Sequence, residues 1–417
     1  MHGWTLLGGV AAAVVAGLYV LWGPVVERKK RRSGLVPGLL NLGNTCFLNA
    51  LLQGLAACPA FLQWLQDHTP SHAHAQPRPL SVALLRLLQA LSGAEATEEH
   101  LLDASSLLEA LRSHRWNISS FEEQDAHELF HVLTASLEDE WDPHPYHRVV
   151  PLFDVQALQE TETPPKQILC RTQVFSAVSL QASWRRQHPF HGRLASNMIC
   201  KRCRHQSPLR YDTFDSLSLS IPATVWGGPV TLEQCLRHFV SSESVQGVEC
   251  DSCNKVGTPG RAEGGRSTFV KQLRLGKLPQ CLCLHLQRLS WSGRCGQALK
   301  RRERVLFGET LALCPFRHSP SRTDADPPSD GKTALANGAC PALPDRSSGS
   351  CAYRLMAVVV HHGDMHSGHF VTFRRSPASP RWLWASDDVV RRSSLQEVLA
   401  SSAYLLFYER IQTTKTT

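Results

Sequence analysis

Apolar residues recur at helical spacing in the first part of the chain. In segment 47–55 they repeat every three or four residues, which predicts a buried helix, and Pro59 is expected to end it. Segments 84–91 and 101–111 show the same period, whereas the Pro-containing segment 68–81 predicts a loop. The N-terminal part of the body is therefore expected to be mainly helical.

The pattern changes from about residue 170 onward. The runs 217–221, 281–286 and 353–361 are apolar or alternate between apolar and polar residues, which predicts strands of a buried sheet. Cys281 and Cys283 point to the same side of one such run and are expected in the core. Helices followed by strands favour an α+β fold.

The region 37–410 is expected to form one elaborated domain, because it contains no internal repeat. Within it, residues 314–350 are rich in Pro, Ser, Asp and Gly and poor in large apolar side chains, which predicts a flexible insertion. Residues 411–417 form a short tail.

An uncharged apolar stretch occupies residues 5–22, close to the roughly 18–20 residues that a membrane-spanning helix needs. The basic run 28–32 follows it, so the positive-inside rule places residues 1–4 across the membrane and the body, after a linker over 23–36, in the cytosol. A buried core helix is the alternative. Short Ala- and Gly-rich anchors with basic flanks are typical of the mitochondrial outer membrane, and an endoplasmic-reticulum anchor stays open.

Charge and cysteine content narrow the class of protein. The net charge is +8, but the basic run 28–32 less Glu27 supplies +4 of it, so a nucleic-acid partner is not expected. The chain has 14 cysteines, including two Cys-x-x-Cys pairs. These pairs, with a candidate thiolate, favour metal binding and catalysis in a reducing compartment over disulfides.

Cys46 is the strongest candidate nucleophile. It follows a Gly/Asn loop and enters the predicted helix in its first turn, with Asn44 or Thr45 as the N-cap. The unpaired amides and the helix dipole there stabilise a thiolate, the reactive form of cysteine. A cysteine buried for packing is the alternative, and Cys58 is expected to be one.

The two Cys-x-x-Cys pairs predict a structural zinc site. Cys200 and Cys203 form one pair and Cys250 and Cys253 the other. Four thiolates close a tetrahedral Zn²⁺ site with no open position, although the long gap requires two hairpins to meet. Redox activity and chance are the alternatives.

His369 is the candidate general base. It opens a predicted strand, directly after the polar turn 362–368, where an imidazole is suited to accept the thiol proton and return it to a leaving amine. A metal cluster is a weaker alternative, formed by His369 together with His361, His362, Asp364 and His366. Some of these histidines could instead hydrogen-bond within the loop.

Four segments carry a family resemblance. Asn-Leu-Gly-Asn-Thr-Cys-Phe-Leu-Asn at 41–49 resembles the cysteine box of the ubiquitin-specific proteases, and Gln-Asp-Ala-His-Glu at 124–128 resembles their second box. Gly-His-Phe at 368–370 resembles the histidine box, and 382–390 resembles the third box. With the cysteine pairs they follow the family's order, and the resemblance covers residues 35–410.

The resemblance implies a catalytic assignment. Cys46 would be the nucleophile, His369 the base, and Asn41 the side chain that stabilises the oxyanion, although a turn-forming role is open for Asn41. Most members of the family place Asp or Asn where this chain has Ser386. Either Ser386 completes the triad with weaker electrostatic support, or Asp387 orients His369 instead.

The resemblance also implies the architecture and the partners. A papain-like thumb and palm would carry zinc-bearing fingers at about 190–260 and follow one transmembrane helix. Gln124 and Asp125 would help to hold the basic C-terminal tail of ubiquitin. With its anchor, the chain resembles the outer-membrane type of this family, whose partners would be ubiquitin, polyubiquitin chains and ubiquitinated outer-membrane proteins.

The implied reaction is hydrolysis of the isopeptide bond at the C-terminal Gly of ubiquitin, opposing ubiquitin-dependent clearance of mitochondria. Two alternatives from other classes remain. The chain could be a catalytically weak, membrane-anchored ubiquitin receptor, its triad weakened by Ser386. It could also be a zinc-dependent adaptor in which Cys46 is structural.

Overall fold

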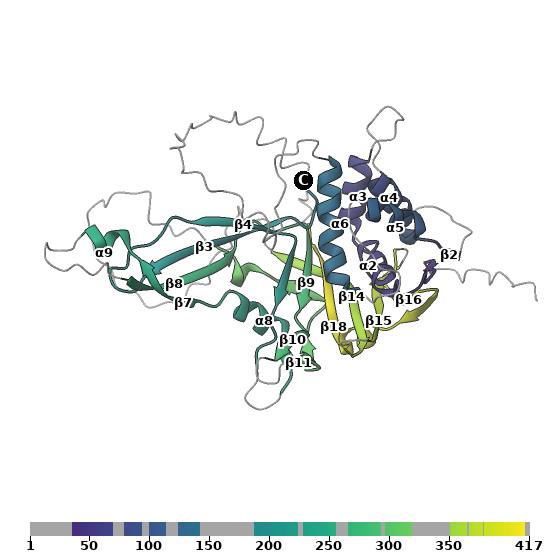
Figure 1. The fold of residues 1–417 in the computed structure, drawn as a ribbon. Coiled ribbons are helices and arrows are strands. Elements are labelled where there is room, and N and C mark those ends of the chain that lie inside the picture. The colour runs from purple at the N-terminus through teal and green to yellow at the C-terminus, as the bar shows by residue number, and fades with distance from the viewer. Residues whose placement is uncertain are drawn as a thin grey trace, which may run out of the picture.

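The computed structural model describes residues 36–69, 79–93, 100–113, 124–141, 187–223, 228–255, 266–292, 297–318, 351–364, 367–377 and 379–412. Helices gather at one end of the molecule, a large sheet lies beside them, and a second sheet extends away to the other end (Figure 1). The expected α+β architecture is confirmed.

The helical end contains α2 (Cys46–Leu55), α3 (Pro59–His68), α4 (Pro79–Ser92), α5 (Ser105–Ser113) and α6 (Ala126–Trp141). Pro59 does not simply end α2. It opens α3, because a proline lacks the N–H that the first helical turn leaves unpaired. The loop predicted to reach residue 81 ends earlier, since Pro79 likewise opens α4. The helix predicted over 101–111 is also wrong at its start: Leu101–Leu102 form strand β2, which pairs with β1 (Gly38–Leu39).

The large sheet has eight strands in the order β17-β16-β15-β14-β18-β9-β5, with β13 also pairing with β14. The strands are β5 (Ser216–Leu219), β9 (Cys281–Leu286), β13 (Thr310–Ala312), β14 (Ala352–Gly363), β15 (Gly368–Arg375), β16 (Trp382–Ser386), β17 (Val389–Ser393) and β18 (Ala403–Arg410). Ala357 and Val359 pack on the helical side, and Val358 and Val360 on the opposite side. Both faces are covered, which explains the unbroken apolar run in β14.

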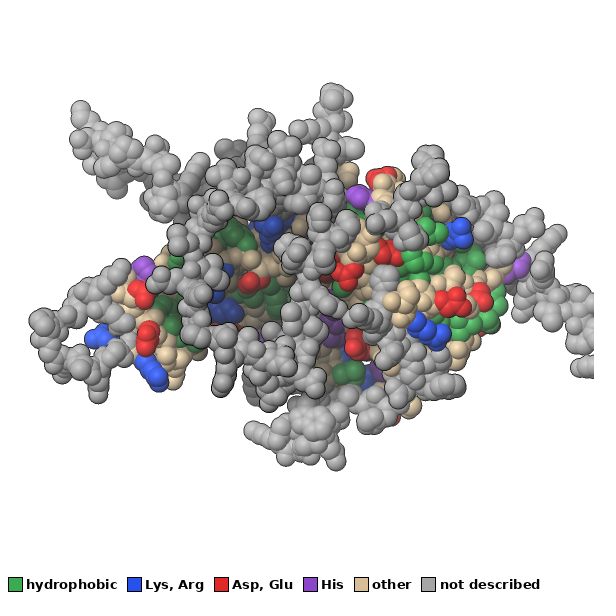
Figure 2. Space-filling view, turned by 45° about the horizontal axis from the view of Figure 1, so that its top comes forward, with side chains coloured by type: hydrophobic (Ala, Val, Ile, Leu, Met, Phe, Trp, Pro, Cys, Tyr) green, Lys and Arg blue, Asp and Glu red, His purple; other side chains and the backbone are tan. Residues whose placement is uncertain are grey.

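The second sheet forms the extension, in the order β4-β3-β8-β7 (Figure 1). Its strands are β3 (Gly192–Cys200), β4 (Arg210–Phe214), β7 (Glu243–Glu249) and β8 (Arg266–Leu275), and α9 (Asp251–Lys255) lies at its far end. The smaller elements are β6 (Val230–Thr231), α8 (Leu232–Phe239), β10 (Leu289–Ser292), β11 (Gln297–Lys300), β12 (Val305–Leu306), the 3₁₀ turn Cys314–Phe316 and α10 (Leu395–Ala400). On the face drawn in Figure 2, acidic and basic side chains of the described residues are interspersed over both ends of the molecule.

The predicted anchor at 5–22 and most of the predicted insertion at 314–350 lie outside the described residues. Within the described ranges, no single helix is long and apolar enough to cross a membrane. The pair α2 and α3, bent by 91°, meets the length and composition criteria only when both helices are taken together.

A buried arginine joins the helices to the sheet. The side chain of Arg374, on β15, is fully buried and donates to Gln53 Oε1 at 2.9 Å, to the Ala56 carbonyl at 3.0 Å and to the Leu91 carbonyl at 3.2 Å. Gln53 in turn donates to the carbonyl of Pro37 at 3.0 Å. This cluster therefore ties the end of α2, the end of α4 and the chain before β1 to one point on β15.

Three histidines meet where α6 crosses β5 and β9. His127 stacks on His285 at 4.0 Å between ring centroids, and its Nε2 lies 3.1 Å from His131 Nε2. Burial, and then the charge of the neighbouring imidazoles, lowers the pKa of His127 to about 3. Burial and the charge of His131 lower the pKa of His285 to about 4. The fold thus favours neutral rings at this junction.

We expect Arg374→Met to lower the free energy of unfolding by about 3 kcal/mol, because it leaves buried oxygen acceptors without a donor. Denaturant unfolding checks this value. Arg237→Met is the matched control, since Arg237 is largely exposed and pairs with Glu233 across one helical turn; its effect should stay within about 0.5 kcal/mol. A loss below about 1 kcal/mol in Arg374→Met would contradict the stabilising role of the Arg374 hydrogen bonds.

We expect stability to fall between pH 7 and pH 5. The folded pKa values of His127 and His285 lie below the ordinary value of 6.5, so their contribution is fully present above pH 6.5 and is lost as the pH falls towards the folded values. The loss should be roughly 2 kcal/mol for each ring by pH 5, read as a lower Tm. The double variant His127→Gln, His285→Gln should show a flatter pH dependence; an unchanged slope would disprove the assignment.

Candidate functional site

Cys46 opens α2, as predicted, and is 6% exposed. Thr45 occupies the N-cap position, but its hydroxyl does not cap the helix. It accepts instead from the amide of Leu42 at 2.9 Å, because the chain turns back through Gly43 with a φ of 111°. The positive end of the α2 dipole lies beside the Cys46 sulfur, where it stabilises negative charge.

His369 is the second residue of β15, and Ser386 is the last residue of β16. The two strands pair directly, and His369 Nε2 lies 2.7 Å from Ser386 Oγ. A hydrogen bond through Nε2 leaves Nδ1 as the ring nitrogen that can exchange a proton with a third group.

α2 and β15 bring Cys46 and His369 to the same end of their contact. Thr372 Oγ1 donates to the carbonyl of Ala50 at 2.7 Å. Two residues later in β15, Arg374 donates to Gln53 and Ala56, which follow Ala50 in the chain. The helix and the strand therefore run in the same direction. Cys46 precedes Ala50 by about 6 Å along the helix, and His369 precedes Thr372 by about 10 Å along the strand. Both therefore lie beyond the same end of this interface.

Asp387 is engaged on the other side of the site. It turns the chain between β16 and β17 with a φ of 48°, and its carboxylate accepts from Asn41 Nδ2 and from Asn49 Nδ2, each at 2.8 Å. Its carbonyl accepts from the amide of Leu39 at 2.8 Å. Both carboxylate oxygens thus hold the loop and the helix that carry Cys46, whereas Ser386 contacts His369.

The amide of Asn41 is fixed at both ends. Its oxygen accepts from the backbone amide of Thr45 at 3.2 Å and from the Thr45 hydroxyl at 3.3 Å, while its nitrogen donates to Asp387. This pattern assigns the orientation of the amide, with the NH₂ group on the side of the β16–β17 turn. One of its two hydrogens is used by Asp387 and the second is left to bind another acceptor.

Asp125 lies directly before α6 and caps it. Oδ1 accepts from the amides of His127 at 2.7 Å and Glu128 at 3.2 Å, and Oδ2 accepts from the hydroxyl of Tyr404. Burial and the charge of Asp125 raise the pKa of Tyr404, so this hydroxyl stays protonated. Gln124 precedes Asp125 and is half-buried. The carboxylate expected to bind ubiquitin is therefore also a structural cap of α6.

The histidine-rich turn does not assemble a metal site among its described residues. Lys300 Nζ lies 3.0 Å from His361 Nδ1 and donates to the carbonyls of His361 and Gly363. Burial and the Lys300 charge lower the pKa of His361 to about 4. An ammonium group at this imidazole disfavours a cation there, and His366 lies outside the described residues.

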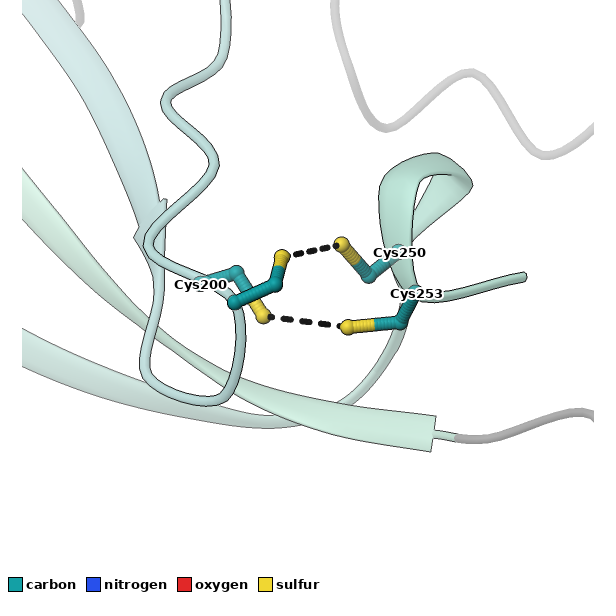
Figure 3. A group of neighbouring side chains, drawn as sticks. Cys200, Cys250 and Cys253 are labelled. Atoms are coloured by element: carbon teal, nitrogen blue, oxygen red, sulfur yellow. Dashed lines mark hydrogen bonds between the residues drawn. The ribbon is translucent and has the colours of Figure 1, made fainter. Parts of the chain in front are cut away.

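The four predicted cysteines converge at the far end of the four-stranded sheet (Figure 3). Cys200 Sγ lies 3.9 Å from Cys253 Sγ, and Cys203 Sγ lies 3.5 Å from Cys250 Sγ. All four sulfurs lie within 4.8 Å of one another. The backbone amide of Cys203 lowers the pKa of the Cys200 thiol to about 6. The arrangement is that of a four-thiolate metal site, and Cys58, Cys281 and Cys283 are core residues, as expected.

Sequence reasoning missed three residues of the site's framework. Arg374 and Thr372 alternate along β15 with the buried residues of the opposite face, so their position in the strand was a readable signal for burial. Asn49, one turn after Cys46, gave no such signal, because its partner Asp387 is distant in the sequence.

Comparisons with known proteins agree with this geometry. The sequence model of the ubiquitin carboxyl-terminal hydrolase family matches residues 37–408. Ubiquitin carboxyl-terminal hydrolase 30 of Homo sapiens is 55% identical over 99% of this chain and 91% of its own length, and that of Danio rerio is 50% identical over 99% and 93%. A solved structure of the SAGA deubiquitinase module bound to ubiquitin aldehyde shares the fold, with a TM-score of 0.63 at 24% identity, over 97% of this chain and 76% of that one.

The family match extends over nearly all the described elements, and its ends coincide with β1 and β18. The chain belongs to the ubiquitin carboxyl-terminal hydrolase family and is a thiol-dependent deubiquitinase.

Proposed function

We propose that this deubiquitinase is anchored in the mitochondrial outer membrane by residues 5–22, faces the cytosol, and removes ubiquitin from outer-membrane proteins. Such an activity opposes ubiquitin signals that mark mitochondria for clearance. The observation that carries the catalytic part is the 2.7 Å contact between His369 Nε2 and Ser386 Oγ, at the end of the interface where α2 begins with Cys46.

The proposed first step is attack of the Cys46 thiolate on the carbonyl carbon of the C-terminal Gly of ubiquitin. His369 takes the thiol proton at Nδ1 while Nε2–H donates to Ser386, then returns a proton to the leaving lysine amine. The serine hydroxyl fixes the ring but adds no negative charge, so imidazolium receives less support than a carboxylate would give. Water then attacks the thioester, with His369 as base, and releases ubiquitin and the free thiol.

Asn41 is the proposed oxyanion donor. The side-chain N–H that Asp387 does not bind and the backbone N–H of Cys46 would meet the negative oxygen of the tetrahedral intermediate. Asp387 supports this role because its contacts to Asn41 and Asn49 hold the amide beside α2. We therefore favour Ser386 as the residue that orients His369, and Asp387 as a positioning residue for Asn41.

Two further sites contribute to substrate binding and to the fold. Asp125, together with Gln124, would bind an arginine of the ubiquitin tail, since a carboxylate binds a guanidinium strongly even when it also caps a helix.

A structural Zn²⁺ would be held by Cys200, Cys203, Cys250 and Cys253. A tetrahedral site with Zn–S bonds of about 2.3 Å has sulfurs about 3.8 Å apart, close to the 3.5 and 3.9 Å separations here.

The proposal of location rests on the sequence before residue 36. A membrane anchor followed by a basic run holds the enzyme beside substrates in the same membrane and raises its effective concentration there. The linker 23–36 leads directly into β1, which contacts the turn at Asp387 through the Leu39 amide.

We expect Cys46→Ala to abolish labelling of the chain by a ubiquitin propargylamide probe, with unchanged ubiquitin binding.

Ser386→Ala should lower kcat/KM by about 10- to 100-fold, because His369 loses the group that fixes its ring. Cleavage of a fluorogenic ubiquitin substrate measures this loss. A folded wild-type chain that binds ubiquitin but is never labelled would instead support the receptor.

The pH profile separates Ser386 from Asp387. Ser386→Asp should raise the apparent pKa of the base in kcat/KM, because a carboxylate stabilises imidazolium. Asp387→Asn should lower kcat/KM without moving that pKa, because it weakens the contacts to Asn41 and Asn49. A lowered base pKa in Asp387→Asn, with Ser386→Ala unchanged from wild type, would transfer the orienting role to Asp387.

We expect the full chain fused to a fluorescent protein to decorate mitochondria, with its body digested by protease added to intact mitochondria. Replacing the basic run 28–32 by Ser should move the chain to the endoplasmic reticulum, since basic flanks favour the mitochondrial membrane in the proposed anchor. Deleting residues 1–35 should release the body into the cytosol with kcat/KM in solution unchanged. Mitochondrial targeting that persists after this deletion would refute the anchor.

A further inference from the structure

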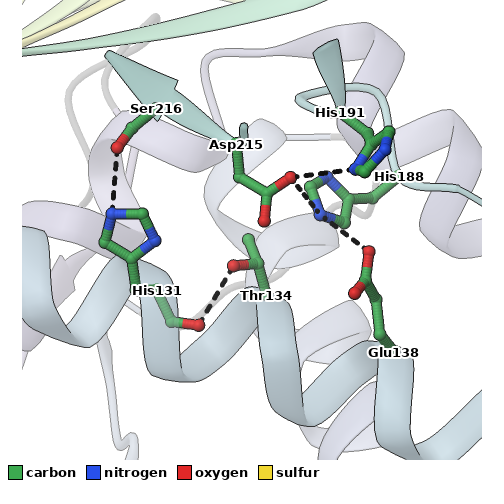
Figure 4. Close-up of polar contacts among 7 residues, drawn as sticks. All are labelled: His131, Thr134, Glu138, His188, His191, Asp215 and Ser216. Carbon is green, nitrogen blue, oxygen red and sulfur yellow. Dashed lines mark hydrogen bonds and ion pairs between the residues drawn. The ribbon is translucent and has the colours of Figure 1, made fainter. Parts of the chain in front are cut away.

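A second cluster of potential metal-binding side chains lies at the end of β3 and β4 opposite to Cys200, beside the paired residues Gly192 and Phe214. Figure 4 shows its side chains. Glu138 comes from α6, His188 and His191 from the segment before β3, and Asp215 from the corner between β4 and β5. One nitrogen or oxygen of each residue lies within 4.8 Å of the others. The cluster thus joins three segments that are distant in the sequence.

One hydrogen bond lies within this cluster, between His191 Nδ1 and Asp215 Oδ1, but His188 has no well-directed one. The His188 side chain is fully buried, and its Nε2 lies 3.3 Å from both Glu138 Oε1 and Asp215 Oδ1, yet neither ring nitrogen forms a well-directed hydrogen bond within the described residues. Asp215 Oδ1 is also 3.1 Å from His191 Nδ1, so one oxygen contacts two imidazoles. A buried imidazole without a directed partner is costly unless another group binds its lone pair.

The separations match the edges of a tetrahedral zinc site. Zn–N and Zn–O bonds of about 2.0–2.1 Å place neighbouring ligand atoms about 3.4 Å apart. The three separations are 3.3, 3.3 and 3.1 Å, and the atoms that approach one another are nitrogens of two imidazoles and oxygens of two carboxylates. Imidazole and carboxylate together suit Zn²⁺, and they differ from the soft thiolates at the far end of the sheet.

We propose that Glu138, His188, His191 and Asp215 bind a second structural Zn²⁺. His188 would ligate through Nε2 and His191 through Nδ1, and the carboxylates would balance the charge of the ion. The Glu138 side chain is 45% exposed and Asp215 is 23% exposed, so the ion can enter from solvent although His188 is enclosed.

The ion would fix the orientation of the four-stranded sheet relative to α6. Glu138 lies near the C-terminal end of α6, while His191 precedes β3 by one residue and Asp215 follows β4 by one residue. Because α6 also carries the Asp125 cap at its start, the same helix would connect this ion to the proposed ubiquitin-tail contact. The inference does not depend on the membrane location or on the choice between Ser386 and Asp387.

The test is the zinc content of the purified full chain, measured by inductively coupled plasma mass spectrometry after dialysis against metal-free buffer. We expect two zinc ions per wild-type chain, one in the double variant His188→Ala, His191→Ala, and one in Cys250→Ser. His238→Ala, which removes an exposed histidine of α8, is the matched control and should retain both ions. X-ray absorption of the wild type needs no variant and should show sulfur and nitrogen/oxygen ligands in comparable numbers.

Cobalt substitution identifies the second site directly. Cobalt-loaded Cys250→Ser should keep the visible d–d bands of a nitrogen/oxygen site, and adding Glu138→Gln should weaken them. One zinc per wild-type chain with sulfur ligands only, and no zinc in Cys250→Ser, would overturn the proposal and leave the cluster as ion pairs. Two zinc ions in the double histidine variant would overturn it as well.

Discussion

One buried charge, Arg374, joins α2 and α4 to β15 and constrains how these elements meet. Its guanidinium lies where the carbonyls at the end of α2 concentrate negative charge, so the helix dipole and the hydrogen bonds both favour it there. Burial lowers its pKa to about 10, which still leaves it protonated at neutral pH. Because successive strand residues face opposite sides, a shift of β15 by one residue would turn Arg374 away from the helix. The same register therefore sets where His369 stands relative to Cys46.

The adjacent residues Ser386 and Asp387 make different polar contacts at the site. The backbone of Asp387 adopts a left-handed conformation, which directs its carboxylate to Asn41 and Asn49 while Ser386, in the preceding strand, faces His369. The carboxylate of Asp387 therefore holds the loop before Cys46, and His369 has a neutral partner, Ser386. This arrangement gives a physical reason for Ser386 at the position facing His369. The neighbouring carboxylate, Asp387, already accepts hydrogen bonds from Asn41 and Asn49.

The sequence predicts most strongly what is local. The helix that starts at Cys46, the strand before His361 and the thiolate pairs follow from periodicity and spacing, and the structure contains all three. The family resemblance named Ser386 and Asp387 but left open which one faces His369, because that depends on the backbone angle of a single turn residue. Arg374 was missed because a charged residue in an apolar strand is normally exposed. His188 and His191 carried no spacing signal, since their partners Glu138 and Asp215 lie on other elements.

The thinness of the extension beyond the large sheet gives a physical reason for metal binding at its two candidate clusters. At its far end the described buried cluster comprises only Cys200, Cys250 and Phe269, too few side chains to stabilise a sheet by burial alone. Four thiolates bound to an ion would replace the missing core with bonds that an unfolded chain cannot form. At its near end the sheet must keep a fixed angle to α6, and contacts between distant segments are entropically costly to close. Ion-bridged clusters at both ends would let a thin sheet hold its shape while its outward faces remain free for a protein substrate.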